Sequence, residues 1–149
     1  MKWLSEKVEK ALELACKAHE GQKDKGGMPY INHPVHVAMT LMANGYGDSY
    51  VIAGLLHDVA EDTEYGLDEI AKLGFGRGVM DALALLTHDK SVPYADYVEC
   101  VAENPIARAV KMADLMHNMD LTRLEKADKS DFERVKKYHK AYDFLKDYE

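Results

Sequence analysis

The sequence VIAGLLHDVAEDT at residues 51–63 combines an apolar helical face with a cluster of acids around one histidine. Because successive residues of a helix are about 100° apart, one face collects the apolar side chains of Val51, Ile52, Leu55, Leu56 and Val59. We expect this face to pack into a helical core. The opposite side of the same helix then presents the polar side chains of His57, Asp58, Glu61 and Asp62.

The three acids of this segment lie near the expected C-terminal end of their helix, where the helix dipole disfavours negative charge. A solvated acidic surface is one explanation and needs no ligand. The other explanation is a bound cation. A divalent metal ion is the simplest candidate, because the adjacent His57 and Asp58 offer an imidazole nitrogen and a carboxylate oxygen to one ion.

A second segment, residues 105–121, shows the same conflict between apolar and charged positions. Asp114 and Asn118 lie four residues apart on one side of an otherwise apolar helix, together with Lys111. An acid that is buried without a partner strongly destabilises a fold. We therefore expect Asp114 to have a partner.

His33 directly precedes Pro34 and the start of another expected helix, a junction that would hold its side chain rigidly. It completes a set of two imidazoles and two carboxylates: His33, His57, Asp58 and Asp114. Such a set leaves open positions on a six-coordinate ion, as catalytic metal sites do. We expect His36 to be a packing or supporting residue. The histidines not expected to be ligands are His19, His88, His117 and His139.

Residues typical of helix starts and ends, with apolar residues at helical spacing between them, continue through the rest of the chain. The alternation typical of strands is nowhere sustained. A loop with two adjacent glycines is expected at residues 22–29. We predict a single domain over residues 1–149, folded as an all-α bundle of seven or eight helices. The expected helices cover residues 5–20, 34–44, 48–62, 67–73, 78–86, 93–103, 105–121 and 130–146.

Composition restricts the class of protein further. The chain has 149 residues, 47% of them hydrophobic, which suffices for one core without disulfide or metal staples. A net charge of −7 argues against binding nucleic acid by phosphate neutralisation. No apolar run is long enough to cross a bilayer, so we expect a soluble, cytoplasmic protein without membrane association. Cys16 and Cys100 are expected to be buried, reduced thiols.

Several short motifs occur in a fixed order along the chain. They are AHEGQ at residues 18–22, PYINHP at 29–34, LLHDVAEDT at 55–63, FG at 75–76 and KMADLMHNM at 111–119. This series resembles the HD phosphohydrolase superfamily, and more specifically the hydrolase domain of RelA/SpoT proteins and their small single-domain metazoan relatives. The resemblance implies an all-α HD fold and a bound Mn²⁺ or similar divalent transition metal. The implied reaction removes the 3′-pyrophosphate from a small-molecule nucleotide, guanosine tetra- or pentaphosphate.

The resemblance also implies roles for individual residues. The implied metal ligands are His33, His57, Asp58 and Asp114. Glu61 and Asp62 are implied to position and deprotonate the attacking water, and the sequence leaves open which of them accepts the proton. The implied substrate-binding residues are Lys25, Asn118, Arg134 and Tyr138. An ordinary amphipathic surface is the alternative for Arg134 and Tyr138, because lysines surround them.

The chain departs from the family pattern at a position that bears on the substrate. Asp24 stands beside Lys25 where the family usually carries an arginine, which weakens the inference to guanosine nucleotides but leaves the metal chemistry unaffected. Tyr94 and Leu115 also stand where relatives often have basic residues. One alternative is therefore a metal-dependent phosphohydrolase of another nucleotide. A second is a nucleotide-binding sensor without turnover, against which the complete acidic pair argues. The oligomeric state is left open.

Overall fold

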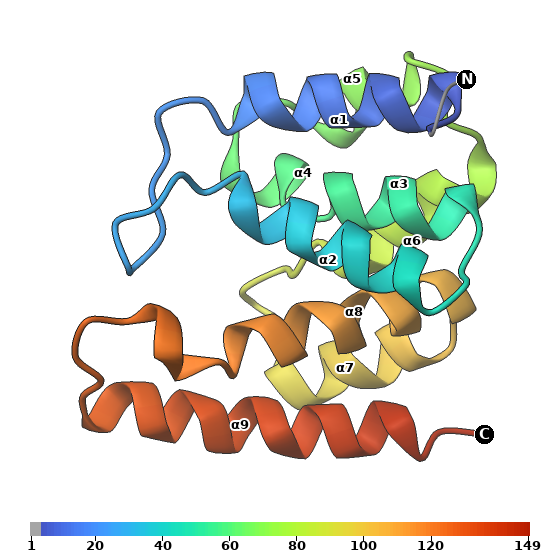
Figure 1. Cartoon of the computed structure of the whole chain (residues 1–149). Coiled ribbons are helices and arrows are strands. Elements are labelled where there is room, and N and C mark those ends of the chain that lie inside the picture. Colours follow the sequence, from blue (N-terminus) through green and yellow to red (C-terminus); the bar gives the residue numbers. More distant parts are fainter. Residues whose placement is uncertain (1–3) are drawn as a thin grey trace.

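A computed structural model describes residues 4–149, and the helical fold predicted from the sequence is confirmed. Within these residues the only strand-like pairing is an isolated bridge between Lys23 and Pro29. Figure 1 shows the elements in chain order. They are α1 (Glu6–Ala18), α2 (Asn32–Ala43), α3 (Asp48–Leu56), α4 (Val59–Asp62), α5 (Leu67–Ala71), α6 (Arg77–Leu86), α7 (Tyr94–Ala102), α8 (Pro105–Asn118), the 3₁₀ turn η1 (Leu121–Arg123) and α9 (Lys129–Lys146).

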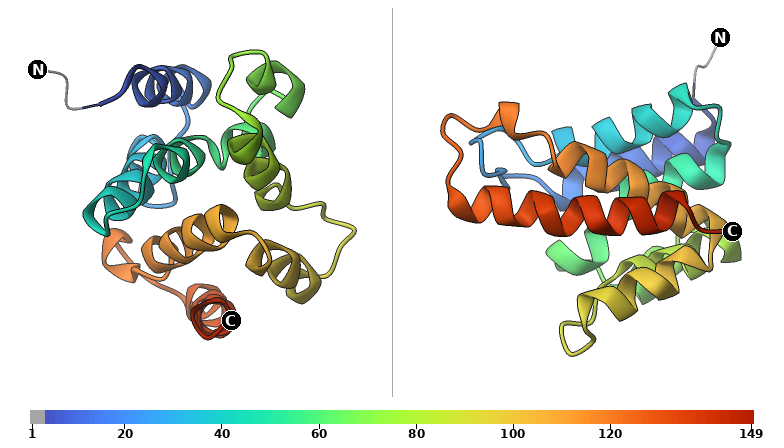
Figure 2. Two further views of the ribbon diagram at one scale, coloured as in Figure 1. Left: turned by 90° about the vertical axis from the view of Figure 1, so that its right-hand side faces the viewer. Right: turned by 90° about the horizontal axis from the view of Figure 1, so that it is seen from below.

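Helix α3 is the centre of the bundle. It packs against α1, α2, α6 and α8, while α9 lies along α8 and α7 on the outside (Figures 1 and 2). Every residue from Val51 to Leu56 is buried, so this helix is enclosed on all sides rather than on the one face expected from the sequence. At Gly54 an added Cβ would lie 2.9 Å from Leu41 Cδ1, so a glycine is required for the close approach of α2.

The predicted helix at residues 48–62 is broken in two. Helix α3 ends at Leu56, and α4 begins at Val59 after Asp58 adopts φ −99° and ψ −5°. The break turns His57 into the interior, where it is buried and its Nδ1 lies 2.6 Å from the Gly54 carbonyl oxygen. The expectation that His57 lies on a face opposite the core is therefore wrong.

Both cysteines are free and exposed, so the prediction of buried thiols is wrong. In α1 the core positions belong to neighbours of Cys16, among them Ala11 and Ala15. In α7 they belong to neighbours of Cys100, among them Val101. Successive side chains of a helix point about 100° apart, so the residue next to a core position can lie at the surface.

The helix boundaries also position two segments of the site. Helix α2 begins at Asn32, so His33 lies inside its first turn rather than before it. Helix α8 ends at Asn118, and η1 then leads the chain back toward the loop before α2 (Figure 1). In the part of the chain that the structure describes, no helix has both the length and the apolar character needed to span a membrane.

Candidate active site

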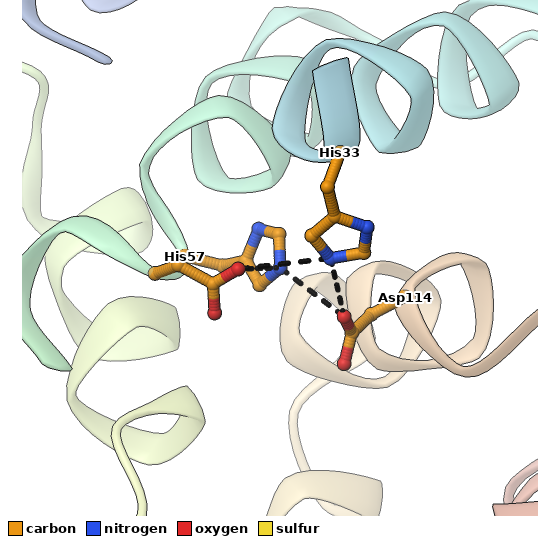
Figure 3. Close-up of side chains that lie close together, drawn as sticks. His33, His57 and Asp114 are labelled. Atoms are coloured by element: carbon orange, nitrogen blue, oxygen red, sulfur yellow. Dashed lines mark hydrogen bonds and ion pairs between the residues drawn. The ribbon is translucent and has the colours of Figure 1, made fainter. Parts of the chain in front are cut away.

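Four side chains from three separate parts of the fold meet in the interior. Each of His33, His57, Asp58 and Asp114 offers one ligand atom, and these atoms lie within 4.8 Å of one another. Figure 3 shows His33, His57 and Asp114 pointing toward one another. The Nε2 atom of His33 lies 2.8 Å from Asp114 Oδ1, and that of His57 lies 3.1 Å from Asp58 Oδ2. We call these four residues the His/Asp cluster.

The chemistry of the His/Asp cluster fits one divalent metal ion. Two nitrogen and two oxygen donors suit a borderline cation and leave further coordination positions open. Burial opposes charge on Asp58 and Asp114, yet cations beside each of them hold the pKa of both carboxyls below the usual range. Burial likewise opposes a charged His57, but the Asp58 carboxylate outweighs it and raises the pKa of His57. The ionised carboxylate of Asp114 is thus buried and that of Asp58 is partly buried near it, an arrangement that a divalent cation stabilises.

A second layer of contacts orients the cluster. The Nδ1 atoms of His33 and His117 are 2.6 Å apart, so one of them must carry the shared proton. Burial, together with Arg123, lowers the pKa of His117 to about 4, which keeps this ring neutral. A neutral His117 can accept the proton of His33 Nδ1, and this tautomer leaves His33 Nε2 free to bind a cation. His36, expected to be a packing or supporting residue, stacks on His117 with ring centroids 3.9 Å apart.

Asp114 also has the partner that its position in a helix demanded. Lys111 Nζ lies 3.0 Å from Asp114 Oδ2, and Asn118 Nδ2 donates to Asp114 Oδ1 at 3.0 Å. Burial alone would lower the pKa of Lys111, but Asp114 outweighs it and raises that pKa well above the usual range. Lys111 is therefore a fixed positive charge next to the cluster.

The acidic pair lies on α4, directly after the helix break. Tyr30 Oη donates to Asp58 Oδ2 at 2.7 Å and lies 3.4 Å from Asp62 Oδ2, so this hydroxyl links the cluster to the pair. Burial and the nearby Asp58 raise the pKa of Asp62, and burial and Asp62 raise the pKa of Glu61. Sequence reasoning missed Tyr30 as a site residue, although it lies in the PYINHP motif, three residues before His33.

The first of two cavities beside the cluster has a volume of about 380 Å³. Its lining includes all four residues that the sequence assigned to substrate binding, namely Lys25, Asn118, Arg134 and Tyr138. The buried carboxylate of Asp131 forms salt bridges with two of these residues. Its Oδ1 lies 2.9 Å from the Arg134 guanidinium and 3.6 Å from Lys25 Nζ. Arg134 and Tyr138 thus line a cavity, and their role in substrate binding stays a prediction.

Asp24 lies in the wall of this first cavity, where a hydrogen bond and a salt bridge hold its carboxylate. The Met28 backbone N–H donates to its Oδ1 at 3.0 Å, and Arg123 lies 3.5 Å from its Oδ2. Arg123 also donates to the His117 carbonyl oxygen at 3.3 Å. A Cβ at Gly26 would lie 2.6 Å from the Arg123 carbonyl oxygen, so this glycine lets the loop rest on η1. Arg123 is a pocket cation that sequence reasoning did not identify.

The second cavity has a volume of about 360 Å³ and adjoins the first. Asp58, Asp114 and Glu61 contribute to its lining. Three residues line both cavities, namely Tyr30, Asn118 and Tyr138. Three lysines line the second cavity only, namely Lys90, Lys111 and Lys137. Residues of the His/Asp cluster thus line both cavities, His33 the first and Asp58 and Asp114 the second.

Comparison with known proteins places the chain in a family. A family model described as an HD domain matches residues 11–96. Human guanosine-3′,5′-bis(diphosphate) 3′-pyrophosphohydrolase MESH1 is 40% identical over 123 residues, which cover 76% of this chain and 68% of the human protein. A GTP pyrophosphokinase of Streptomyces antibioticus is 38% identical over 133 residues, which cover 83% of this chain and 16% of that protein. The chain thus spans a small part of the pyrophosphokinase and about two thirds of the human hydrolase.

Solved structures agree with this assignment. A metazoan ortholog of SpoT, described as hydrolysing ppGpp, superposes with a TM-score of 0.81 at 27% identity, over 99% of this chain and 90% of that one. The protein lmo0812 from Listeria monocytogenes gives a TM-score of 0.65 at 29% identity, over 82% and 85% of the two chains. The fold, the His/Asp cluster and these similarities together show that the chain belongs to the HD-domain family, in the group that includes the MESH1 hydrolases.

Proposed function

We propose that this protein is a Mn²⁺-dependent phosphohydrolase that removes the 3′-pyrophosphate from guanosine tetraphosphate in the cytoplasm. The observation that carries the proposal is the position of the His/Asp cluster between an acidic pair and a cation-lined cavity. The metal ligands are His33, His57, Asp58 and Asp114. The human and mouse relatives of this protein are named for this reaction. The first cavity also offers both cations and aromatic surface to a phosphorylated nucleoside.

The reaction is an in-line attack of water on the phosphorus bound to the ribose 3′-oxygen. When bound, the divalent ion would lower the pKa of water and stabilise the negative charge of the phosphoryl oxygens. The protein supplies the acceptor for the proton of that water and the groups that hold the nucleotide. Lys25, Arg134 and Tyr138 hold the nucleoside and its 5′-phosphates in the first cavity, and Asn118 contacts the reacting phosphate.

Glu61 is the proposed proton acceptor. It lines the second cavity together with Asp58 and Asp114 of the cluster, whereas Lys25 and Arg134 line only the first, so Glu61 can hold a water that a nucleotide in the first cavity does not displace. The carboxylate of Asp62 instead lies beside the Tyr30 hydroxyl, and its backbone carbonyl oxygen accepts a hydrogen bond from Gln22 at 2.9 Å. Asp62 therefore has the role of positioning Glu61.

Hydrolysis of another phosphorylated nucleotide is the second candidate, and Asp24 is the observation that favours it. Its carboxylate occupies the cavity wall at the position where the family usually carries an arginine. A sensor without turnover is less well supported, because a binding protein has little use for two acids whose pKa values are raised beside a metal site.

The test is a steady-state assay of the Mn²⁺-loaded protein with guanosine tetraphosphate, a 3′-phosphorylated adenosine nucleotide and NADPH. We expect guanosine tetraphosphate to give the highest kcat/KM and chelator to abolish the activity. The Asp58→Ala protein is the inactive control. Comparable kcat/KM values on all three compounds would discard the specificity for guanosine tetraphosphate, and full activity in chelator would discard the metal-dependent reaction.

A further inference from the structure

The second cavity contains a group of cations that the proposed reaction has not used. Lys90, Lys111 and Lys137 line it together with Tyr94 and Tyr97. We call this part of the second cavity the lysine pocket. We propose that the lysine pocket binds the terminal phosphate of the substrate's 3′-diphosphate, and so makes the enzyme select diphosphates over monophosphates at that position. This inference rests on the proposed function.

Two of the three lysines are available to an anion. Lys111 is paired with Asp114 at 3.0 Å. Within residues 4–149, neither Lys90 nor Lys137 forms a salt bridge with a carboxylate. The three lysines share the cavity lining with three carboxylates, those of Asp58, Glu61 and Asp114, so the cavity has a surplus of positive charge when a divalent ion occupies the His/Asp cluster.

The ammonium group of Lys137 is also held in place. Its Nζ lies 4.1 Å from the centroid of the Tyr94 ring, a cation–π contact that keeps the charge at the pocket. Lys90 is an exposed residue of the loop between α6 and α7. Tyr94, a departure from the family pattern, thus contributes to the pocket by holding a lysine from α9.

The chemistry of the reaction requires a site of this kind. Water forms a bond to the phosphorus while the bond to the ribose 3′-oxygen breaks, and that oxygen leaves as a hydroxyl with a proton from solvent water. The proton of the water passes to Glu61, and the released product is inorganic pyrophosphate. The nucleoside lies along the line of attack, so the terminal phosphate must project sideways from it.

The location of the lysine pocket matches that requirement. Its cavity includes Asp58 and Asp114 of the cluster, so it adjoins the proposed metal site. In the proposed function the nucleoside occupies the first cavity, and Lys90, Lys111 and Lys137 line only the second. Lysine ammonium groups are suitable partners for a terminal phosphate, which carries close to two negative charges at neutral pH.

The test compares the wild-type holoenzyme with Lys90→Gln, Lys137→Gln and the double variant on three guanosine nucleotides. These carry a 5′-diphosphate with a 3′-diphosphate, a 5′-monophosphate with a 3′-diphosphate, and a 5′-diphosphate with a 3′-monophosphate. We expect each substitution to lower kcat/KM by about 10- to 100-fold on both 3′-diphosphates and to leave the 3′-monophosphate nearly unchanged. Lys136→Gln, an exposed lysine on α9 outside both cavities, is the matched control for the lost charge.

A different pattern would overturn the proposal. If the loss followed the number of phosphates on the 5′ side, the lysines would bind the 5′-diphosphate. If Lys136→Gln caused the same loss, the effect would be general attraction of anions. Calorimetric binding of inorganic pyrophosphate to the metal-loaded Glu61→Gln protein separates this proposal from the proposed function. If pyrophosphate binding to this variant depends on the lysines but the wild-type protein hydrolyses no guanosine nucleotide, the proposed function alone fails. Pyrophosphate binding that is unchanged by Lys90→Gln and Lys137→Gln would instead overturn the lysine pocket.

Discussion

The His/Asp cluster and the wall of the first cavity are built in different ways. The cluster residues lie on or at the ends of the packed helices α2, α3 and α8, and both of its histidines are buried with each ring nitrogen in contact with a partner. The wall is made by residues 23–29 and η1, where Asp24 and Arg123 form an ion pair that stays partly exposed. The difference indicates that the helical core fixes the reaction, while loops select the substrate.

Removing one cluster ligand should break the first half of this comparison and cause the largest effect. We expect Asp58→Ala to lose both the metal and the hydrolytic activity, because a carboxylate that two imidazoles face is removed. Elemental analysis after metal loading and gel filtration measures retention. Binding to the folded state stabilises it, so chelator should lower the melting temperature of the wild type and leave Asp58→Ala unaffected.

The matched control is Asp68→Ala, which removes an exposed acid from α5 outside the cluster and should retain one ion per chain. Stoichiometric metal in Asp58→Ala would show that the ligand set is wrong.

Changing the acid pair should separate turnover from metal binding. We expect Glu61→Gln to keep the metal and to lose about 10²- to 10⁴-fold in kcat, the usual range for general-base assistance. Asp62→Asn should also keep the metal, with a loss in kcat that reflects misplacement of Glu61. Inductively coupled plasma analysis and single-turnover rates on the same samples provide both readouts. Metal content that falls in parallel with the rate would place Glu61 among the ligands.

The same variant makes a prediction about stability and pH. Burial and Asp62 raise the pKa of Glu61 in the folded protein, so its ionised form opposes folding. In chelator, Glu61→Gln should therefore melt at a higher temperature than the wild type above the raised pKa. The difference should shrink as pH falls through that value and vanish below the ordinary pKa of a glutamate. Calorimetric scans across pH 3 to 8, a range set by ordinary carboxyl pKa values of about 4, check this expectation.

Support from His117 should have a smaller effect on the cluster. A leucine at this position cannot accept the proton of His33 Nδ1, and we expect His117→Leu to weaken metal affinity by about 10- to 100-fold. The Oδ1 atom of an asparagine can take the place of the acceptor nitrogen, so His117→Asn should recover most of the affinity. Competition against a metal-binding dye measures both. Equal loss in the two variants would mean that packing against His36, rather than the hydrogen bond, is what matters.

Reversing the ion pair in the cavity wall should have the smallest effect and act on the substrate alone. We expect Asp24→Arg and Arg123→Asp each to raise KM several-fold with little change in kcat, because like charges then face each other across the wall. The double variant, in which the charges are exchanged, should return KM toward the wild-type value. Asp24→Asn controls for the loss of negative charge near an anionic ligand. A kcat that falls with KM unchanged would place this pair in the reaction rather than in substrate selection.

The parts of this arrangement that the sequence could predict are those set by local pattern. Helix periodicity predicts an all-α bundle. An acid in an apolar helical segment marks Asp114 as a residue that needs a partner, and the acids crowded near a helix C-terminus mark the segment of His57 and Asp58 as a candidate cation site. The break at residues 57–58 was not predictable, because nothing in the local pattern distinguishes a continuous helix over 48–62 from two helices. The burial of His57 depends on the helices that enclose α3, which periodicity does not reveal.

Contacts between distant segments explain the other omissions. Asp24 meets Arg123 and Lys137 meets Tyr94 only because η1 and α9 fold back over the site. Each of these residues looks like ordinary surface in its own segment. The buried thiols were predicted wrongly for a related reason, since a one-residue shift within an apolar helical pattern decides between Ala15 and Cys16.

In the proposed function, the His/Asp cluster directs water to the phosphorus on the ribose 3′-oxygen. Hydrolysis of guanosine tetraphosphate by the Mn²⁺-loaded protein in water labelled with heavy oxygen tests it, with the products analysed by phosphorus NMR and mass spectrometry. We expect guanosine 5′-diphosphate without label and inorganic pyrophosphate with one labelled oxygen. Label in the nucleoside product, or release of orthophosphate instead of pyrophosphate, would contradict this mechanism.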